Sequence, residues 1–217
     1  IYYPSRIIID SSYSGAMAMY KVQGIIFDLD GTLVELPIDW GRVIRHVESL
    51  LGRKVRSLLD LFPKLWGTKK YEEISRAIEE FEIASLSGLK ILDDSPRLLI
   101  ELSLKYKLGL VTFQGRNVTR KIIDKMGINR LLIVTRDDAP TRAEQISRIV
   151  SAAQLESKEF LVVGDRLNDV YSALKVGCNA VLVNRWGRYD LNRTGEEFAV
   201  IPNLKELPRL LRIREES

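Results

Sequence analysis

A short apolar run that ends in two carboxylates places the strongest constraint on the fold of this chain. The run spans residues 25–27, and Asp28, Asp30 and Gly31 follow it. A continuous apolar run this short, with glycine on both sides, is typical of a buried strand in a parallel sheet. Ligands of open α/β sheets bind beyond the carboxyl ends of the strands. The two aspartates are therefore predicted to lie where the chemistry is done.

Two carboxylates this close together favour a bound cation. Side chains two positions apart on an extended chain can face the same space. Asp28 and Asp30 would then repel each other unless a cation joins them or one keeps a proton. Mg²⁺ takes oxygen ligands and leaves room for a substrate phosphate, so it is the predicted cofactor. Taken alone, an Asp-x-Asp-Gly pattern also fits a calcium loop or an acidic turn.

Composition limits the classes of protein to consider. The 217 residues suit one domain, or one domain with a small insert, and 46% of them are hydrophobic. The net charge is +4 without a basic run interleaved with aromatic residues, so we predict no nucleic-acid partner. The single cysteine, Cys178, fits a reducing compartment, and no apolar run is long enough to cross a membrane. We expect a cytoplasmic monomer or homodimer that binds no membrane.

Three later segments repeat the pattern of an apolar run followed by polar residues. Residues 108–113 read as a strand that ends near Thr112, and a helix from about residue 117 places backbone N–H donors beside it for an anion. The run 131–134 precedes a helix that opens near residue 141, and the run 160–163 leads to an acidic turn. Strands therefore alternate with helices, which predicts an α/β fold with a doubly wound, Rossmann-like parallel sheet.

The chain divides into a core and an insertion. Residues 36–93 show helical apolar spacing punctuated by glycines, and we call this segment the helical insert. The α/β core is predicted to comprise residues 20–35 and 94–213. Residues 1–19 read as an N-terminal extension without an assigned role.

These motifs resemble the signatures of the haloacid dehalogenase (HAD) superfamily. The segment Asp28-x-Asp30-Gly-Thr resembles the first signature, and Gly-Asp165-x-x-x-Asp169 resembles the fourth. The strand that ends at Thr112 is similar to the second, although Phe113 and Gln114 follow it where relatives often have asparagine. The helical insert resembles the cap that closes over the active site of relatives and selects the substrate.

The third signature of that superfamily is a lysine at the start of a helix, and this chain departs from it. Arg142 is the candidate for that position, with Arg136 and Lys125 in reserve. Arginine keeps its charge and grips phosphate with two parallel hydrogen bonds, so it is not a simple replacement for lysine. The alternative reading of Arg142 is a surface residue on a helix.

The resemblance implies a role for each site residue. Asp28 attacks phosphorus, and Asp30 serves as general acid and base. Thr112, Phe113 and Arg142 bind the phosphoryl oxygens. The implied ligands of Mg²⁺ are Asp28, the Asp30 backbone carbonyl, Asp165 and Asp169.

The resulting prediction is a Mg²⁺-dependent phosphatase that hydrolyses a small phosphorylated metabolite through an aspartyl-phosphate intermediate. The short cap resembles that of phosphoglycolate phosphatases. A dehalogenase of the superfamily lacks an acid at the position of Asp30. Three alternatives stay open: a sugar phosphomutase of the same superfamily, a phospho-accepting receiver domain, and a catalytically silent binding protein.

Overall fold

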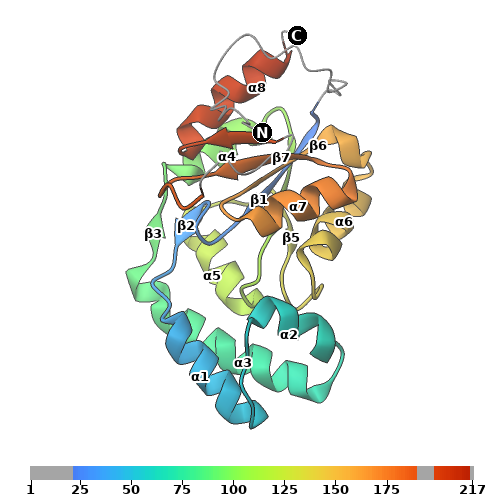
Figure 1. Ribbon diagram of the computed structural model, residues 1–217. Helices are drawn as coiled ribbons and strands as arrows, with labels where there is room; N and C mark the ends of the chain where they lie inside the picture. Colours follow the sequence, from blue (N-terminus) through green and yellow to red (C-terminus); the bar gives the residue numbers. More distant parts are fainter. Residues whose placement is uncertain (1–21, 190–197, 216–217) are drawn as a thin grey trace, which may run out of the picture.

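The computed structural model describes residues 22–189 and 198–215, and its centre is a six-stranded parallel sheet (Figure 1). The strand order is β5-β4-β1-β6-β7-β8, so β1 lies in the middle. The predicted extension, residues 1–19, lies outside the described residues. The strands of this sheet are β1 (Gly24–Asp28), β4 (Lys107–Val111), β5 (Leu132–Val134), β6 (Phe160–Gly164), β7 (Asn179–Val183) and β8 (Ala199–Ile201).

Helices cover both faces of the sheet, which confirms the predicted doubly wound α/β fold (Figure 1). On one face, Ile25 and Phe27 of β1 join an apolar cluster with α4 (Ser95–Ser103), α5 (Arg116–Met126) and α8 (Leu207–Glu215). On the other face, Ile26 packs in a cluster with α6 (Arg142–Ala153) and α7 (Leu167–Val176). Because both faces of β1 are buried, its sequence is a continuous apolar run rather than an alternating one.

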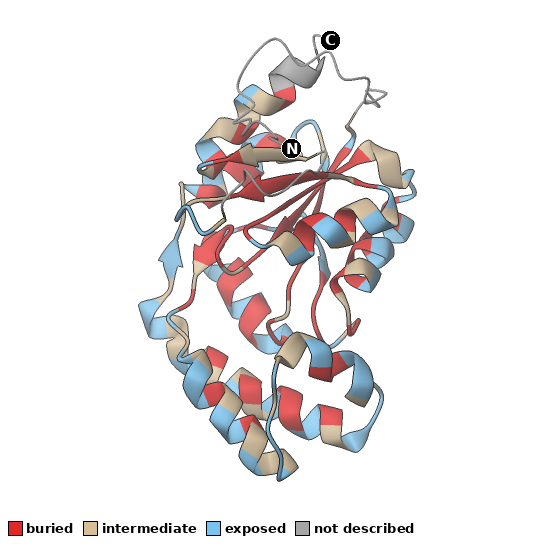
Figure 2. Cartoon of the chain, viewed as in Figure 1, coloured by how far each residue is buried: buried red, intermediate tan, exposed pale blue. Residues whose placement is uncertain are grey.

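The helical insert lies beyond the carboxyl-terminal edge of the sheet and has an apolar cluster of its own (Figure 1). Two short strands, β2 (Val34–Glu35) and β3 (Lys90–Ile91), pair antiparallel where the chain leaves and re-enters the core. Figure 2 shows buried positions on the faces that the insert helices turn toward one another. The helices are α1 (Trp40–Leu51), α2 (Leu58–Leu65), α3 (Lys69–Ala84) and the 3₁₀ turn η1 (Ser85–Gly88).

Each of the three α-helices of the insert begins at a side-chain cap. Asp39, Ser57 and Thr68 accept hydrogen bonds from backbone N–H groups three residues further on. Such caps satisfy amide donors that have no partner inside the helix. None of the described helices combines the length and the apolar character needed to cross a membrane. Two further 3₁₀ turns are η2 (Ser157–Glu159) and η4 (Leu204–Glu206).

The sheet topology fixes where a ligand can bind. The chain moves from β1 to β4 and β5 on one side, and then to β6, β7 and β8 on the other. The strand order therefore reverses beside β1, and open α/β sheets bind ligands at such a reversal, outside the carboxyl ends of the strands. Asp28 is the last residue of β1 and lies at this point.

Candidate active site

Three buried carboxylates converge at the carboxyl ends of β1 and β6. Asp28 ends β1, Asp165 follows β6, and Asp169 lies in the first turn of α7. One oxygen from each carboxylate lies within 4.8 Å of the other two. Their exposed fractions are 5%, 3% and 1% respectively. The structure thus brings together three of the four acids that the sequence predicts as metal ligands.

Two glycines make this close approach possible. Gly31 has a φ of +95°, which favours glycine, and a Cβ atom there would lie 2.5 Å from an oxygen of Asp165. A Cβ atom on Gly164 would lie 2.4 Å from an oxygen of Asp169. Any side chain at either position would push the carboxylates apart.

Arg142 joins two of the three carboxylates. Its Nη2 donates a hydrogen bond to Asp28 Oδ1 at 2.6 Å, and its Nε forms an ion pair with Asp169 Oδ1 at 2.8 Å, without hydrogen-bond alignment. The guanidinium also lies over the ring of Phe113, 4.7 Å from the centroid. Arg142 is 5% exposed, so the alternative reading of a surface arginine is wrong.

Gln145 supports this arginine, and the sequence analysis missed it. Its Oε1 accepts a hydrogen bond from Arg142 Nη1 at 2.8 Å, and its Nε2 donates to the backbone oxygen of Thr112 at 2.8 Å. The side chain is fully buried on the face of α6 that also carries Ile146 and Ile149. A polar residue within the apolar stripe of a predicted helix is the signal that could have identified it.

Residues 112–114 follow β4, and they make side-chain contacts at the site that the sequence does not specify. The Thr112 side chain is fully buried and its hydroxyl bonds to Gln114 Oε1, while Gln114 N donates back to Thr112 Oγ1 at 3.1 Å. Of the three residues 112–114, Phe113 and Gln114 line the cavity above the carboxylates. Binding of phosphate by Thr112 stays a prediction, and its hydroxyl would first have to turn away from Gln114.

The start of α5, which the sequence predicts as an anion site, is occupied by carboxylates of the insert. Gly115 N donates to Glu82 Oε2 at 3.0 Å. Asn117 N and Val118 N both donate to Glu79 Oε1, at 2.8 and 3.2 Å. The donors that the sequence offered to an anion are therefore taken by carboxylates of this chain, three of them by α3 and one, Arg116 N, by Asp137 at 2.7 Å.

Arg136, a reserve candidate for the lysine position, instead fastens the insert to the core. It follows β5 in the chain, is fully buried, and its Nη1 lies 2.5 Å from Glu82 Oε1 of α3. Its Nε donates to Ser75 Oγ at 2.9 Å, and Nη1 donates to the Phe113 oxygen at 2.7 Å. The other reserve, Lys125, is exposed in the last turn of α5. Arg142 is therefore the cation that reaches Asp28.

The acids of the site have raised pKa values. Burial raises the pKa of Asp28 well above its usual range; Arg142 opposes this rise, and Asp169 and Asp165 add to it. Burial, and next the charge of Asp169, also raise the pKa of Asp165. Burial raises the pKa of Asp30 to about 6, while a hydrogen bond from a backbone N–H group holds it lower. A carboxyl with a pKa near 6 can both give and take a proton close to neutral pH.

Asp30 stands apart from the three converging acids. Its Oδ1 accepts that hydrogen bond from Leu36 N at 2.8 Å, where the chain enters the helical insert. Asp30 nevertheless lines the same cavity as Asp28, where a substrate would bind. Metal binding through its backbone carbonyl stays a prediction.

The cavity has a volume of about 390 Å³ and lies between the core and the insert. Its floor includes Asp28, Asp30 and Asp169. The insert supplies apolar walls, namely Trp40, Ile44, Leu58, Leu59, Phe62 and Ile78. Once a cation is bound to these acids, such a floor beneath apolar walls suits a ligand with one anionic end and a less polar body.

The donor set fits a hard divalent cation. Asp165 Oδ1 is a buried oxygen without a hydrogen-bond partner among the described residues, and Asp169 Oδ1 has only the misaligned ion pair with Arg142. Buried polar atoms normally have partners, because an unpaired one is costly in free energy. Three carboxylate oxygens within 4.8 Å of one another match the oxygen ligands that Mg²⁺ and Ca²⁺ prefer.

Comparisons with known proteins agree with the fold and with the acidic site. A family model for haloacid dehalogenase-like hydrolases matches residues 43–183. A haloacid dehalogenase-like hydrolase domain-containing protein of Arabidopsis thaliana is 28% identical over 187 residues, covering 79% of this chain and 75% of that relative.

Two solved structures share the fold across nearly their whole length. A HAD phosphatase from Thermococcus onnurineus has a TM-score of 0.61 at 24% identity, covering 88% of this chain and 98% of that one. A predicted phosphoglycolate phosphatase from Haemophilus somnus has a TM-score of 0.56 at 16% identity, covering 88% and 99%. The family match covers more than half of the chain, and the sheet order and the converging acids agree with it. This chain is a member of the haloacid dehalogenase-like hydrolase family.

Proposed function

We propose that this hydrolase is a Mg²⁺-dependent phosphatase of small phosphomonoesters that works through an aspartyl phosphate on Asp28. The observation that carries the proposal is the position of Asp28. Its carboxylate lies on the floor of the cavity, held by Arg142 on one oxygen and close to Asp165 and Asp169. The Asp28 carboxylate can therefore meet a phosphoryl group beside Arg142 and beside the acids that would hold the metal ion.

In the first step, an oxygen of Asp28 attacks phosphorus in line with the leaving oxygen. The bond from phosphorus to the ester oxygen breaks, and its electron pair stays on that oxygen. Asp30 donates the proton that makes the leaving group an alcohol. The pKa of Asp30, raised to about 6 by burial, leaves part of its population protonated near neutral pH.

In the second step, Asp30 takes a proton from a water molecule that attacks phosphorus. The bond from phosphorus to the Asp28 oxygen breaks, so inorganic phosphate leaves and the Asp28 carboxylate is restored. Arg142, fixed by Gln145, holds a phosphoryl oxygen through both steps and offsets its charge.

Asp28, Asp165 and Asp169 would hold the metal ion, with the Asp30 backbone carbonyl as a further ligand. When bound, Mg²⁺ supplies positive charge that offsets the repulsion between the carboxylates and the phosphoryl group. The ion would also lower the pKa values that burial raises in Asp28 and Asp165.

Phosphoglycolate is the first metabolite to test, because the short helical insert resembles the cap of phosphatases that act on it. The apolar walls also leave room for a bulkier ester. A cytoplasmic monomer or homodimer stays our expectation for the protein in the cell.

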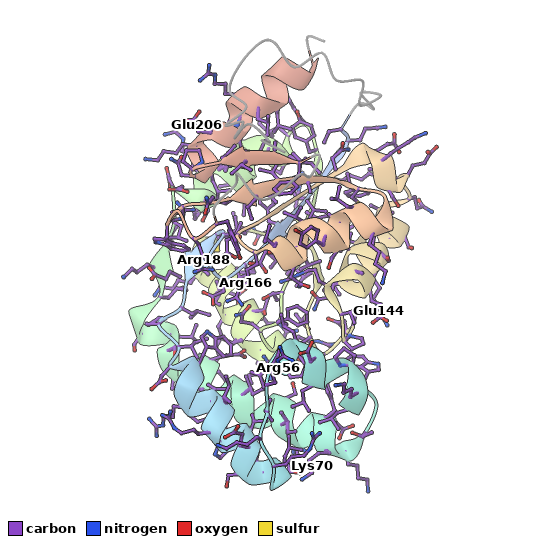
Figure 3. All side chains as sticks on the ribbon, viewed as in Figure 1. Arg56, Lys70, Glu144, Arg166, Arg188 and Glu206 are labelled. Atoms are coloured by element: carbon purple, nitrogen blue, oxygen red, sulfur yellow. The ribbon has the colours of Figure 1, made fainter. Side chains whose placement is uncertain are left out.

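The test is phosphate release from an aryl phosphate, measured with Mg²⁺ or with EDTA, for the wild type and Asp28→Asn. We expect Mg²⁺-dependent turnover that EDTA abolishes and that falls at least about 1,000-fold in the variant, because the variant lacks the nucleophile. Glu144→Gln is the matched control, since Glu144 is an exposed acid on α6 outside the cavity (Figure 3).

Other outcomes would select the alternatives. Turnover that EDTA leaves intact would contradict the metal-dependent mechanism. A stable aspartyl phosphate without release would favour a receiver, and transfer between positions of a sugar bisphosphate would favour a mutase. No turnover of aryl phosphate or of a phosphometabolite panel would overturn the phosphatase proposal.

A further inference from the structure

The arginines that line the cavity fall into two groups. Arg136 is paired with Glu82, and Arg142 is paired with Asp28 and Asp169. The other two lining arginines, Arg56 and Arg166, form neither a hydrogen bond nor an ion pair through their side chains within residues 22–189 and 198–215. These two are the arginines of the cavity lining that have no carboxylate partner among the described residues.

These two arginines differ in their position. Arg166 follows β6, and its charge lowers the pKa values of Asp30 and Asp165, against the effect of burial. Arg166 therefore belongs to the electrostatics of the reacting end. Arg56 precedes α2 in the helical insert, and Figure 3 shows it at the level where the insert meets the core.

The residues around Arg56 are those expected around a ligand-binding arginine. Leu58, Leu59 and Phe62 follow it on α2 and form part of the apolar wall. The neighbouring Arg53 lies in the same loop, and both arginines are exposed, but only Arg56 lines the cavity. The planar guanidinium of Arg56 matches carboxylate and phosphate groups, and its exposure leaves it open to a ligand that enters the cavity.

We propose that Arg56 is a specificity-determining residue that binds a second anionic group at the end of the substrate remote from the phosphoryl group. The preferred substrate would then carry a phosphoryl group at Asp28, a less polar middle against α2, and a carboxylate or second phosphate at Arg56. This inference rests on the proposed phosphatase function and adds the substrate class to it.

The test compares three esters that share the same four-carbon chain: butyl phosphate, 4-phosphonooxybutanoate and butane-1,4-diyl bisphosphate. We expect the wild type to prefer the esters with a second acid group, and the better of the two identifies that group as carboxylate or phosphate. Arg56→Ala should lower the ratio of kcat/KM for the preferred acidic ester to that for butyl phosphate by about 10–100-fold, the usual effect of losing a charge-assisted pair. Arg56→Lys should restore part of the ratio, and Arg53→Ala should leave it at the wild-type value.

Equal losses on acidic and neutral esters, or no preference in the wild type, would overturn the proposal. A binding measurement separates this failure from failure of the phosphatase assignment, because a carbon–phosphorus bond resists hydrolysis by this mechanism. We expect 4-phosphonobutanoate to bind more tightly than butylphosphonate to the Mg²⁺-loaded wild type and Arg53→Ala, and equally to Arg56→Ala. That result in a protein without turnover would keep the Arg56 site and reject the phosphatase.

Discussion

Arg136 Nη1 lies 2.5 Å from Glu82 Oε1, and both side chains are fully buried. The pair crosses from the core to α3 of the helical insert, so it joins two segments of the chain that are far apart in sequence. Burial raises the pKa of Glu82, and Arg136 and the Gly115 N–H group oppose that rise. A charge pair that has little access to water therefore links the insert to the core.

We expect the two residues of this pair to be strongly coupled in stability. Glu82→Leu leaves the buried charge of Arg136 without its carboxylate and should lower the free energy of unfolding by about 3–5 kcal/mol. Arg136→Met should do the same, and the double variant should lose much less than the sum, because neither charge is left alone. Urea unfolding of the wild type and the three variants gives the coupling energy.

The exposed pair Arg97 and Glu101 is the matched control for that cycle. It has the same charges at 2.9 Å on the surface of α4, with side chains 77% and 56% exposed. Its coupling should be at most about 0.5 kcal/mol, because water screens exposed pairs. Additive losses at Arg136 and Glu82 would contradict the view that the pair holds the insert in place.

Replacing Arg142 with alanine or with lysine should distinguish how its charge affects kcat from how its contact with two carboxylates affects kcat. Arg142→Ala removes the contacts to Asp28 and Asp169 and should lower kcat about 100–1,000-fold, as loss of a group that stabilises transition-state charge does. Arg142→Lys keeps the charge but cannot hold both carboxylates at once, so we expect an intermediate loss. Equal kcat values for the two variants would show that charge at this position does not matter.

Removal of Asp165 should weaken the binding of Mg²⁺. Asp165→Asn replaces one of the two buried carboxylate oxygens that accept no hydrogen bond and takes away a negative charge. The Mg²⁺ concentration that gives half of the thermal stabilisation should rise about 10-fold or more, and Glu144→Gln should not change it. Differential scanning fluorimetry with increasing Mg²⁺ measures this concentration without relying on activity.

Cys178 should resist labelling until the protein unfolds. The thiol is 4% exposed, and burial raises its pKa from 9.0 to about 12. The unfolded thiol ionises first, so the unfolded state loses its proton as the pH rises from about 9 to 12, and folding stability falls over that window. Iodoacetamide should react with Cys178 only at the rate of unfolding, and Cys178→Ala should flatten the stability profile above pH 9. Rapid labelling of the native protein would contradict this expectation.

The sequence predicted the sheet and its acidic site because both depend on local patterns. Residues 25–27 lie in the buried strand β1. Asp28 and Asp165 lie at the carboxyl ends of β1 and β6, at the same edge of the sheet, as predicted. The carboxyl ends of neighbouring parallel strands lie at one edge of the sheet. Acidic motifs that follow two such strands are therefore expected to form one cluster, even when the tertiary structure is unknown.

Contacts between the insert and the core could not be predicted in the same way. Glu82 and Arg136 are 54 residues apart, and each reads as an ordinary charged residue in its own segment. The orientation of the Thr112 hydroxyl toward Gln114 depends on side-chain torsions that no spacing rule fixes. Such contacts are decided by how the segments pack, and a periodic pattern carries no information about them.

The carboxylates of Glu79 and Glu82 accept hydrogen bonds at the start of α5, and this limits how the helical insert can be exchanged. Three of the four N–H groups at this helix start take their acceptors from the insert, and the fourth takes Asp137 of the core. An exchange of residues 36–93 for the corresponding segment of a relative would succeed as protein engineering only if the donor segment brought its own two acids to the same places. The helical insert of this enzyme is therefore a poor interchangeable module, and we expect point changes in residues 56–62 to alter substrate range more easily than grafting.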